Sequence, residues 1–121
     1  MDTNNFWDAL DTLVATSDII IDRPRGSLHP RYPDVRYPLD YGYLQGTSSG
    51  DGAGIDVWIG SLPDRTVEAL IRTVDLKKRD TEIKLLLGCT PEKVQPILAF
   101  HQRFSNDGGQ SAMLIERAAT Q

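Results

Sequence analysis

The chain is poor in the residues that mark several large classes of protein. Its 121 residues include one cysteine, Cys89, and two histidines, so an internal disulfide is excluded and no His/Cys metal spacing exists. No apolar run approaches the ~20 residues of a membrane span, and the N-terminus lacks the basic start and apolar stretch of a secretory signal. We therefore expect a cytoplasmic protein without a membrane segment.

A surplus of basic residues is also missing. The net charge of −4 argues against a nucleic-acid partner, because binding to a phosphate backbone normally requires a basic face. The charge is nevertheless uneven, since four arginines lie between Arg23 and Arg36 against one acid, Asp34. Guanidinium groups bind phosphate oxygens in bidentate fashion, although arginines on a solvated loop would explain the same segment.

The length and the order of apolar patterns predict one α+β domain over residues 1–121. A helix is expected from about Phe6 to Ala15, capped by Asn4 or Asn5, and a second one from about Thr90 to Phe104, with Pro96 as a site for a kink or a later start. The expected strands are a short run at 19–21, a tyrosine-rich strand before the glycine loop, and the runs 54–59, 65–75, 82–87 and 112–116, the last at an edge.

The segment from Tyr37 to Asp56, YPLDYGYLQGTSSGDGAGID, combines tyrosines and aspartates around a loop of small residues. Carboxylates bind hard cations such as Mg²⁺, whereas phenol hydroxyls and backbone N–H groups bind phosphate oxygens. The segment therefore indicates a metal and phosphate site. A turn that follows a tyrosine-rich strand is an equally good explanation of these residues taken alone.

Two more carboxylates, Asp75 and Asp80, flank a basic turn at the ends of neighbouring strands. A hairpin at this point can bring them toward Asp51 and Asp56, and four clustered aspartates would require cations. Strand-end aspartates also serve as turn caps, and the sequence leaves both interpretations open.

These residues resemble the soluble family I inorganic pyrophosphatases. The segment Tyr37-Pro38-Leu39-Asp40-Tyr41-Gly42-Tyr43 and the segment Asp51-Gly52-Ala53-Gly54-Ile55-Asp56-Val57 are similar, in sequence and in spacing, to the YPxxYGY and DGDPxDV elements of that family. The stretch 21–27, IDRPRGS, is similar to an E-x-P-K-G-S element, and Asp75 and Asp80 reproduce a D-x₄-D spacing. The resemblance extends from about Ile19 to Glu116.

The resemblance implies an OB-like five-stranded β-barrel with an N-terminal helix and one helix in the C-terminal half. It also implies hydrolysis of pyrophosphate, or of a related phosphoanhydride, with Mg²⁺ as the cofactor and Mn²⁺ as a substitute. Family members often form homo-oligomers, so self-association is a further expectation. By position, the residues implied are Asp51, Asp56, Asp75 and Asp80 for metal, Tyr41 and Asp56 for catalysis, and Arg31, Tyr41, Arg25 and Arg36 for substrate.

The chain departs from the family pattern mainly where phosphate and the attacking water would be held. Ala53 replaces the carboxylate that orients the water, Pro33 replaces another carboxylate, and Glu82 stands where the family has a lysine. A hairpin that carries a phosphate-binding arginine is absent, and Phe104 and Ser105 replace a Tyr-Lys pair. We therefore expect reduced or altered activity, and the alternative is an impaired pyrophosphatase-like protein that binds metal or phosphate for sensing or partner binding.

Overall fold

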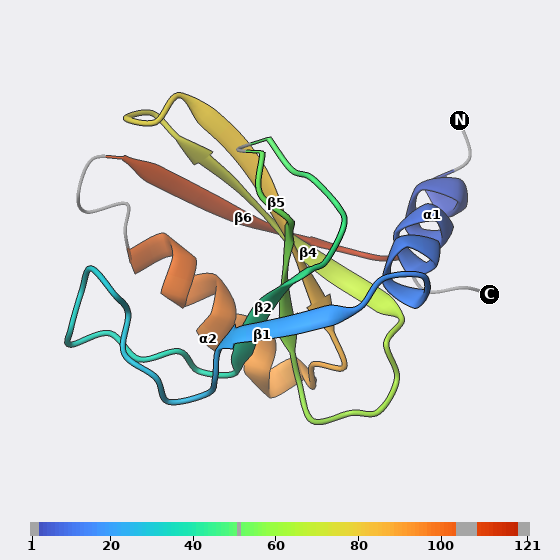
Figure 1. Cartoon of the computed structure of the whole chain (residues 1–121), viewed down its shortest axis with the longest axis horizontal. Helices are drawn as coiled ribbons and strands as arrows, with labels where there is room; N and C mark the ends of the chain where they lie inside the picture. The colour runs from blue at the N-terminus through green and yellow to red at the C-terminus, as the bar shows by residue number, and fades with distance from the viewer. Residues whose placement is uncertain (1–2, 51, 104–108, 119–121) are drawn as a thin grey trace.

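A computed structural model describes residues 3–50, 52–103 and 109–118 of the chain. The elements, in chain order, are α1 (Thr3–Ala15), β1 (Ile19–Arg23), β2 (Asp40–Leu44), β3 (Ile55–Ile59), β4 (Val67–Asp75), β5 (Asp80–Leu87), α2 (Pro91–Gln102) and β6 (Gln110–Glu116). The α+β class is confirmed (Figure 1). Neither of the described helices is long and apolar enough to cross a membrane.

The strands form one sheet in the order β1-β2-β3-β5-β4-β6. All neighbours pair in antiparallel fashion except β3 and β5, which are parallel because β4 lies between them in the chain and returns beside β5. The prediction of five strands in a barrel is therefore corrected: the sheet has six strands, and β1 and β6 form opposite edges that do not pair within the described residues. A barrel closes only when its two edge strands pair with each other.

The sheet has an apolar layer on each face, because successive side chains along a strand point to opposite sides. One layer contains Trp7, Leu10 and Val14 of α1, packed on Val57 and Leu85. The other layer joins α2 and the loop 24–39 to the sheet through buried residues, namely Val35, Tyr37, Leu39, Trp58, Ala69, Ile71, Leu86, Ile97 and Phe100. Figure 1 shows this loop beside α2.

Several element boundaries differ from the predicted ones. Helix α1 already includes Asn4 and Asn5, so these residues do not cap it. Helix α2 begins at Pro91, where the missing N–H is harmless, and it continues through Pro96 to Gln102 rather than starting later. Phe104, predicted to end this helix, lies outside the described residues. The edge position of the last strand is confirmed by β6.

A glycine permits the close approach of the edge strand β1 to β2. Gly42 pairs with Ile21, and a Cβ atom at Gly42 would overlap the backbone carbonyl oxygen of Ile20. The β1 backbone bends beside it, because the register shifts between Ile21 and Arg23. This bend leads the chain into the loop 24–39, which forms one wall of the pocket described next.

Candidate functional site

Polar side chains gather on the α2 face of the sheet, where the strand alternation places them. In β3, Asp56 shares a face with the buried Trp58, and in β5, Glu82 and Lys84 share a face with the buried Leu86. Because β3 and β5 are parallel, their register brings Asp56 directly beside Lys84. The sheet thus places an acid and a base next to each other at the end of an apolar layer.

Lys84 and Asp56 form a short, poorly exposed ion pair. The Lys84 Nζ donates to Asp56 Oδ2 at 2.6 Å, and the two side chains are 10% and 23% exposed. A second carboxylate oxygen, Glu82 Oε1, lies 3.5 Å from the same ammonium group. A charge removed from water requires compensating partners, and here one ammonium group is shared by two carboxylates.

Tyr41 in β2 lies beside this pair. Its ring contacts the rings of Trp58 and Tyr37, with centroid distances of 4.6 and 5.5 Å. Burial, followed by the negative charge and hydrogen bond of Asp56, raises the pKa of the Tyr41 hydroxyl well above its usual range. Tyr41 therefore remains a neutral phenol at physiological pH and can donate a hydrogen bond.

His101 in α2 lies near Lys84, across the pocket from the sheet. It is buried, and its Nε2 accepts a hydrogen bond from Trp58 Nε1 at 3.0 Å. Burial, and then the nearby charge of Lys84, lower the pKa of His101 to about 3. The imidazole is therefore neutral, with its proton on Nδ1, because Nε2 acts as an acceptor.

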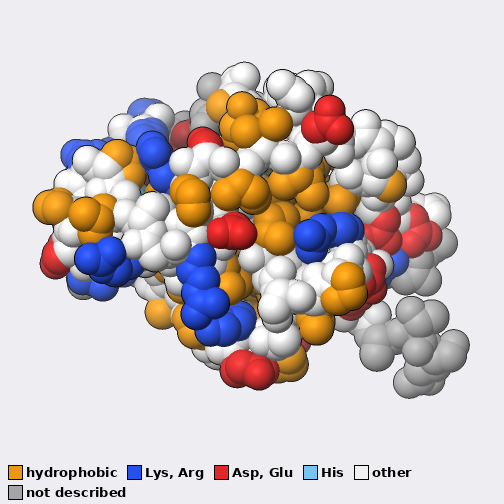
Figure 2. All heavy atoms as spheres, turned by 60° about the horizontal axis from the view of Figure 1, so that its bottom comes forward, with side chains coloured by type: hydrophobic (Ala, Val, Ile, Leu, Met, Phe, Trp, Pro, Cys, Tyr) orange, Lys and Arg blue, Asp and Glu red, His pale blue; other side chains and the backbone are white. Residues whose placement is uncertain are grey.

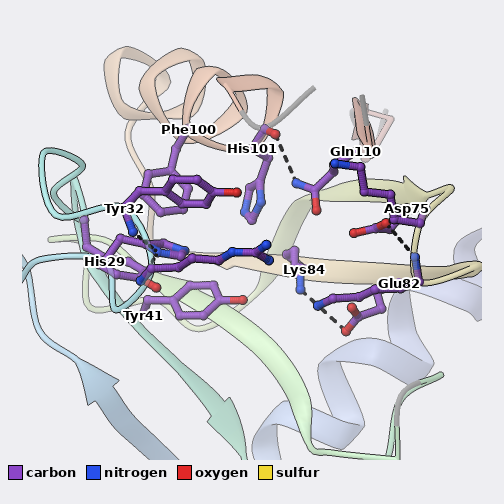
Figure 3. Close-up of a pocket in the computed structure, with 14 residues that line it drawn as sticks. His29, Tyr32, Tyr41, Asp75, Glu82, Lys84, Phe100, His101 and Gln110 are labelled. Atoms are coloured by element: carbon purple, nitrogen blue, oxygen red, sulfur yellow. Dashed lines mark hydrogen bonds and ion pairs between the residues drawn. The ribbon is translucent and has the colours of Figure 1, made fainter. Parts of the chain in front are cut away.

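Of these residues, Tyr41, Glu82, Lys84 and His101 line a cavity of about 250 Å³, which we call the Lys84 pocket. Its walls come from the loop 24–39, β2, the β4–β5 hairpin, α2 and the start of β6. The lining residues are His29, Arg31, Tyr32, Tyr37, Tyr41, Asp75, Lys77, Lys78, Glu82, Lys84, Phe100, His101, Gly109 and Gln110. In Figure 3, Lys84 lies between aromatic side chains on one side and Asp75, Glu82 and Gln110 on the other.

The hairpin between β4 and β5 supplies the basic side of the pocket. Asp75 and Asp80 are the last register pair of this hairpin. Asp75 Oδ1 accepts hydrogen bonds from the backbone N–H groups of Lys77 and Lys78, at 3.0 and 2.9 Å. Asp75 thus acts as a turn cap, which was the alternative to its role in a metal site, and it fixes two lysines at the pocket wall.

The three predicted arginines lie in different places. Arg31 lines the Lys84 pocket, and its guanidinium carbon is 5.7 Å from the ring centroid of Tyr32. Arg36 donates to the backbone oxygen of Gly26 and lines a separate hollow beside α2. The backbone N–H of Arg25 donates to Asp40. The structure therefore places one of the three arginines at the pocket.

The described residues do not fit the multi-carboxylate metal centre that the resemblance implies. Asp51 lies outside the described residues. Asp56 is engaged by Lys84, one Asp75 oxygen is engaged by two N–H groups, and Asp80 faces Asp75 across the hairpin. Within the described part of the chain no three His, Cys, Asp or Glu residues group as metal ligands. An ammonium group and a divalent cation compete for the same Asp56 oxygens.

Comparison with known proteins supports the fold. No protein-family model matches the chain, and no curated protein matches it. Solved structures of inorganic pyrophosphatases do match. The one from Helicobacter pylori is 13% identical with a TM-score of 0.57 (81% of each chain covered), and the one from Coxiella burnetii is 14% identical with a TM-score of 0.54 (81% of this chain and 82% of that one).

A third pyrophosphatase structure, from Thermus thermophilus, is 19% identical with a TM-score of 0.52, and 82% of this chain and 81% of that one are covered. Identities this low show a shared fold and nothing finer. The resemblance found in the sequence is therefore confirmed at the level of the fold, while membership of the family stays a prediction.

Sequence reasoning missed most of the pocket. Lys84 lies two residues beyond Glu82, the position of the family lysine, and it belongs to none of the motifs that indicated a site. His29, Tyr32 and Gln110 were not assigned to the site. The sequence shows that Asp56 and Lys84 both lie in predicted strands, which is a weak signal. Only the register of the folded sheet shows that the two residues face each other.

Proposed function

We propose that this protein binds inorganic pyrophosphate or a related phosphoanhydride in the Lys84 pocket, and that its capacity for hydrolysis is impaired. The observation that carries this proposal is the Lys84 ammonium group, 2.6 Å from the Asp56 carboxylate. The resemblance assigns a metal to Asp56. The Lys84 ammonium group occupies the position at Asp56 that the resemblance gives to a metal. This supports anion binding by side chains, without the metal cluster that would activate water.

The charge of the pocket supports an anionic ligand. Four cationic side chains line it, Arg31, Lys77, Lys78 and Lys84, against two carboxylates, Asp75 and Glu82. Asp56, which is ion-paired with Lys84, is a third carboxylate, so four minus three leaves a local charge of +1 in a chain whose net charge is −4. His101 adds no charge because burial keeps it neutral. A concave site of this sign concentrates multiply charged anions.

Titration calorimetry with pyrophosphate tests the binding. The variant Lys77→Gln/Lys78→Gln removes two exposed charges from the pocket wall, and we expect the dissociation constant to rise about 5- to 30-fold, for a loss of about 1–2 kcal/mol. Both lysines are exposed, so the fold should be retained.

The matched control is Arg72→Gln/Lys93→Gln, which removes two charges away from the pocket. Arg72 is exposed on β4 and alternates with the buried Ile71 and Thr73, so it points away from the α2 face. Lys93 lies at the opposite end of α2 from His101, roughly 12 Å along the helix. Equal loss of affinity in the two double variants, or no binding of pyrophosphate by the native chain, would contradict the proposal.

Slow hydrolysis of pyrophosphate is the second candidate function, and the fold shared with inorganic pyrophosphatases favours it. In this candidate Mg²⁺ or Mn²⁺ arrives as part of the substrate, bound to its phosphate oxygens. The Tyr41 hydroxyl exchanges its Asp56 partner for a phosphate oxygen. Asp56 then accepts a proton from the water that attacks phosphorus, while the bridging P–O bond breaks and the second phosphate leaves. The absence of a carboxylate at Ala53 would slow the reaction by about 10²- to 10⁴-fold.

Release of phosphate from pyrophosphate and from nucleoside triphosphates, with Mg²⁺ or Mn²⁺, separates the two candidates. The comparison uses the native chain, Asp56→Asn and Ala53→Asp. Activity abolished by Asp56→Asn, together with a gain from Ala53→Asp, supports hydrolysis. Ligand binding without phosphate release in any of the three chains supports the binding function alone. Turnover equal to that of an intact pyrophosphatase would refute the impairment.

The surface agrees with the proposed class of small ligand. On the face shown in Figure 2, basic and acidic side chains are interspersed among apolar ones, so this face does not offer the continuous basic surface that a nucleic-acid backbone requires. The cytoplasmic location and self-association stay predictions.

A further inference from the structure

The tip of the loop 24–39 carries Arg31 to the wall of the Lys84 pocket. Residues 29–32 form one turn and residues 32–35 a second, in which the Val35 N–H donates to the Tyr32 carbonyl oxygen at 2.9 Å. The His29 N–H donates to the Val35 carbonyl oxygen at 2.8 Å and closes the base of the tip. The tip lies outside the strands of the sheet, so local contacts determine its shape.

The side chain of His29 fixes the first turn. Its Nδ1 accepts hydrogen bonds from the backbone N–H groups of Arg31 and Tyr32, at 3.0 and 3.3 Å. Asparagine and aspartate side chains form turns of the same kind, in which a side-chain atom replaces a backbone acceptor. Burial, and then the charges of Arg23 and Arg31, lower the pKa of His29. The imidazole is therefore neutral at pH 7 and its Nδ1 remains an acceptor.

The imidazole ring is itself packed on the apolar layer beneath the loop. It stacks on the buried Tyr37, with centroids 5.9 Å apart and the two ring planes 5° apart. Its centroid is 6.2 Å from that of Phe100 in α2. In Figure 3, His29, Tyr32 and Phe100 lie on the same side of Lys84. His29 therefore connects the core to the backbone of the tip.

Arg31 depends on His29 at both ends of its side chain. Nδ1 binds the backbone N–H of Arg31, and it also binds the N–H of Tyr32, whose ring centroid lies 5.7 Å from the Arg31 guanidinium carbon. A guanidinium group that stacks on a ring keeps its N–H donors in its own plane. Within the described residues Arg31 forms no ion pair, so these donors can bind phosphate oxygens.

We propose that His29 is a positioning residue, which holds Arg31 in the geometry that binds the phosphate oxygens of the ligand. This inference rests on the proposed function and adds a residue to its site. Without the Nδ1 acceptor the tip has more conformations, and Arg31 must then be ordered when the ligand binds. Ordering of this kind reduces the affinity, because a preorganised group avoids that cost.

Two variants of His29 separate its acceptor from its ring in titration calorimetry with pyrophosphate. His29→Phe keeps a ring against Tyr37 but has no acceptor, and we expect the dissociation constant to rise about 3- to 10-fold. His29→Asn has no ring, but its Oδ1 is as many bonds from Cα as Nδ1 is and can accept the same N–H groups. It should bind pyrophosphate within about 2-fold of the native chain.

A double-mutant cycle shows whether the effect depends on Arg31. Arg31→Gln alone should raise the dissociation constant about 3- to 10-fold, and adding His29→Phe should change it by less than about 2-fold. The matched control is Ser27→Ala, which removes another hydrogen bond of this loop, from Ser27 Oγ to the Pro24 carbonyl oxygen at 2.6 Å. Ser27 does not line the pocket, so the affinity should stay unchanged. Thermal unfolding of each variant checks the fold.

Hydrogen exchange reports on the turn without any ligand. The amides of Arg31 and Tyr32 should exchange faster in His29→Phe than in the native chain, because their acceptor is lost. In His29→Asn the exchange should stay close to that of the native chain. Equal exchange of both amides in His29→Phe and in the native chain would overturn the role of Nδ1.

The binding outcomes separate this inference from the function on which it rests. If the native chain binds pyrophosphate and His29→Phe binds it equally well, the inference is overturned and the binding function survives. The inference is also overturned if His29→Asn weakens binding as much as His29→Phe, or if His29→Phe has its full effect in the Arg31→Gln background. If the native chain does not bind pyrophosphate at millimolar concentration, the proposed function and the inference both fail.

Discussion

Acid should destabilise this protein through one buried imidazole. His101 is 5% exposed, accepts a hydrogen bond from Trp58 and has its pKa lowered to about 3 by burial and by Lys84. The ordinary pKa in the unfolded chain is 6.5. The folded state therefore binds the proton more weakly than the unfolded state, so the stability is complete above pH 6.5 and is lost as the pH falls toward 3.

The size of the effect follows from this difference in pKa. Each pH unit between the two values changes the free energy of unfolding by about 1.4 kcal/mol. From pH 7 to pH 5 the loss covers about 1.5 units, which gives about 2 kcal/mol from His101 alone. A domain with a typical stability of about 5–15 kcal/mol would register this as a clear shift in its urea midpoint.

Urea unfolding at pH 7 and pH 5, for the native chain and for His101→Gln, measures the effect. The glutamine amide does not titrate in this range, and its oxygen can still accept the Trp58 Nε1 hydrogen bond. Other groups that titrate between pH 5 and 7, such as His29, are shared by both chains and cancel in the difference. We expect the native chain to lose about 2 kcal/mol more than His101→Gln.

The reasoning would be refuted if the two chains lost the same stability between pH 7 and pH 5, within the ~0.5 kcal/mol typical of such comparisons. That result would mean that the folded state protonates His101 as readily as the unfolded state does, through an opening of α2 or a change of partner. The assignment of a neutral His101 to the wall of the Lys84 pocket would then be wrong as well.

Three further predictions concern other parts of the fold. Lys84→Met should lower the free energy of unfolding in urea by about 3–5 kcal/mol, because it leaves the Asp56 carboxylate without its cation. The double variant Lys84→Met/Asp56→Asn should recover most of this loss. Equal stabilities of the native chain and Lys84→Met would refute a stabilising role for the ion pair. Gly42→Ala should destabilise the protein by about 1–3 kcal/mol and speed hydrogen exchange in β1, since its Cβ meets the Ile20 carbonyl; unchanged exchange would contradict this. Burial raises the pKa of the Cys89 thiol to about 11, so about 0.1% is thiolate at pH 8, and disulfide-reagent labelling should be slow until urea is added; immediate labelling of the folded chain would argue against burial.

Much of the fold could be predicted from the sequence because local patterns control it. The helix over 91–102 follows from Pro91 and Glu92 in its first turn, and the long strand 67–75 follows from its alternation of apolar and polar residues. The local patterns also indicated six strands, but they could not show that the sheet stays open. Strand β6 adds to β4 from the far end of the chain, and the resemblance suggested a closed barrel of five strands.

The candidate site was likewise predictable only in part. Tyr41 and Arg31 were assigned to substrate from the sequence, and both line the Lys84 pocket. Asp75 was an open choice between a metal ligand and a turn cap; its Oδ1 caps the hairpin through two backbone hydrogen bonds, and its role as a metal ligand stays a prediction. Arg36 lies on the segment expected to bind phosphate, but its guanidinium group turns to the Gly26 carbonyl. The partners of Asp75 lie two and three residues away and that of Arg36 ten residues away, so these choices depend on the conformation of the hairpin and of the loop, which the sequence pattern does not specify.

The sequence by itself determined the α+β class, the strand alternation, and the presence of acids, tyrosines and arginines at pyrophosphatase-like spacings. These properties depend on neighbours within a few residues, so the chain displays them before it folds. Only the tertiary structure decided that Asp56 meets Lys84 and that His101 lies neutral beside Trp58. Register between strands and the burial of a helix are set by packing across the whole core, and they place the Lys84 ammonium group at Asp56, a residue for which metal binding stays a prediction.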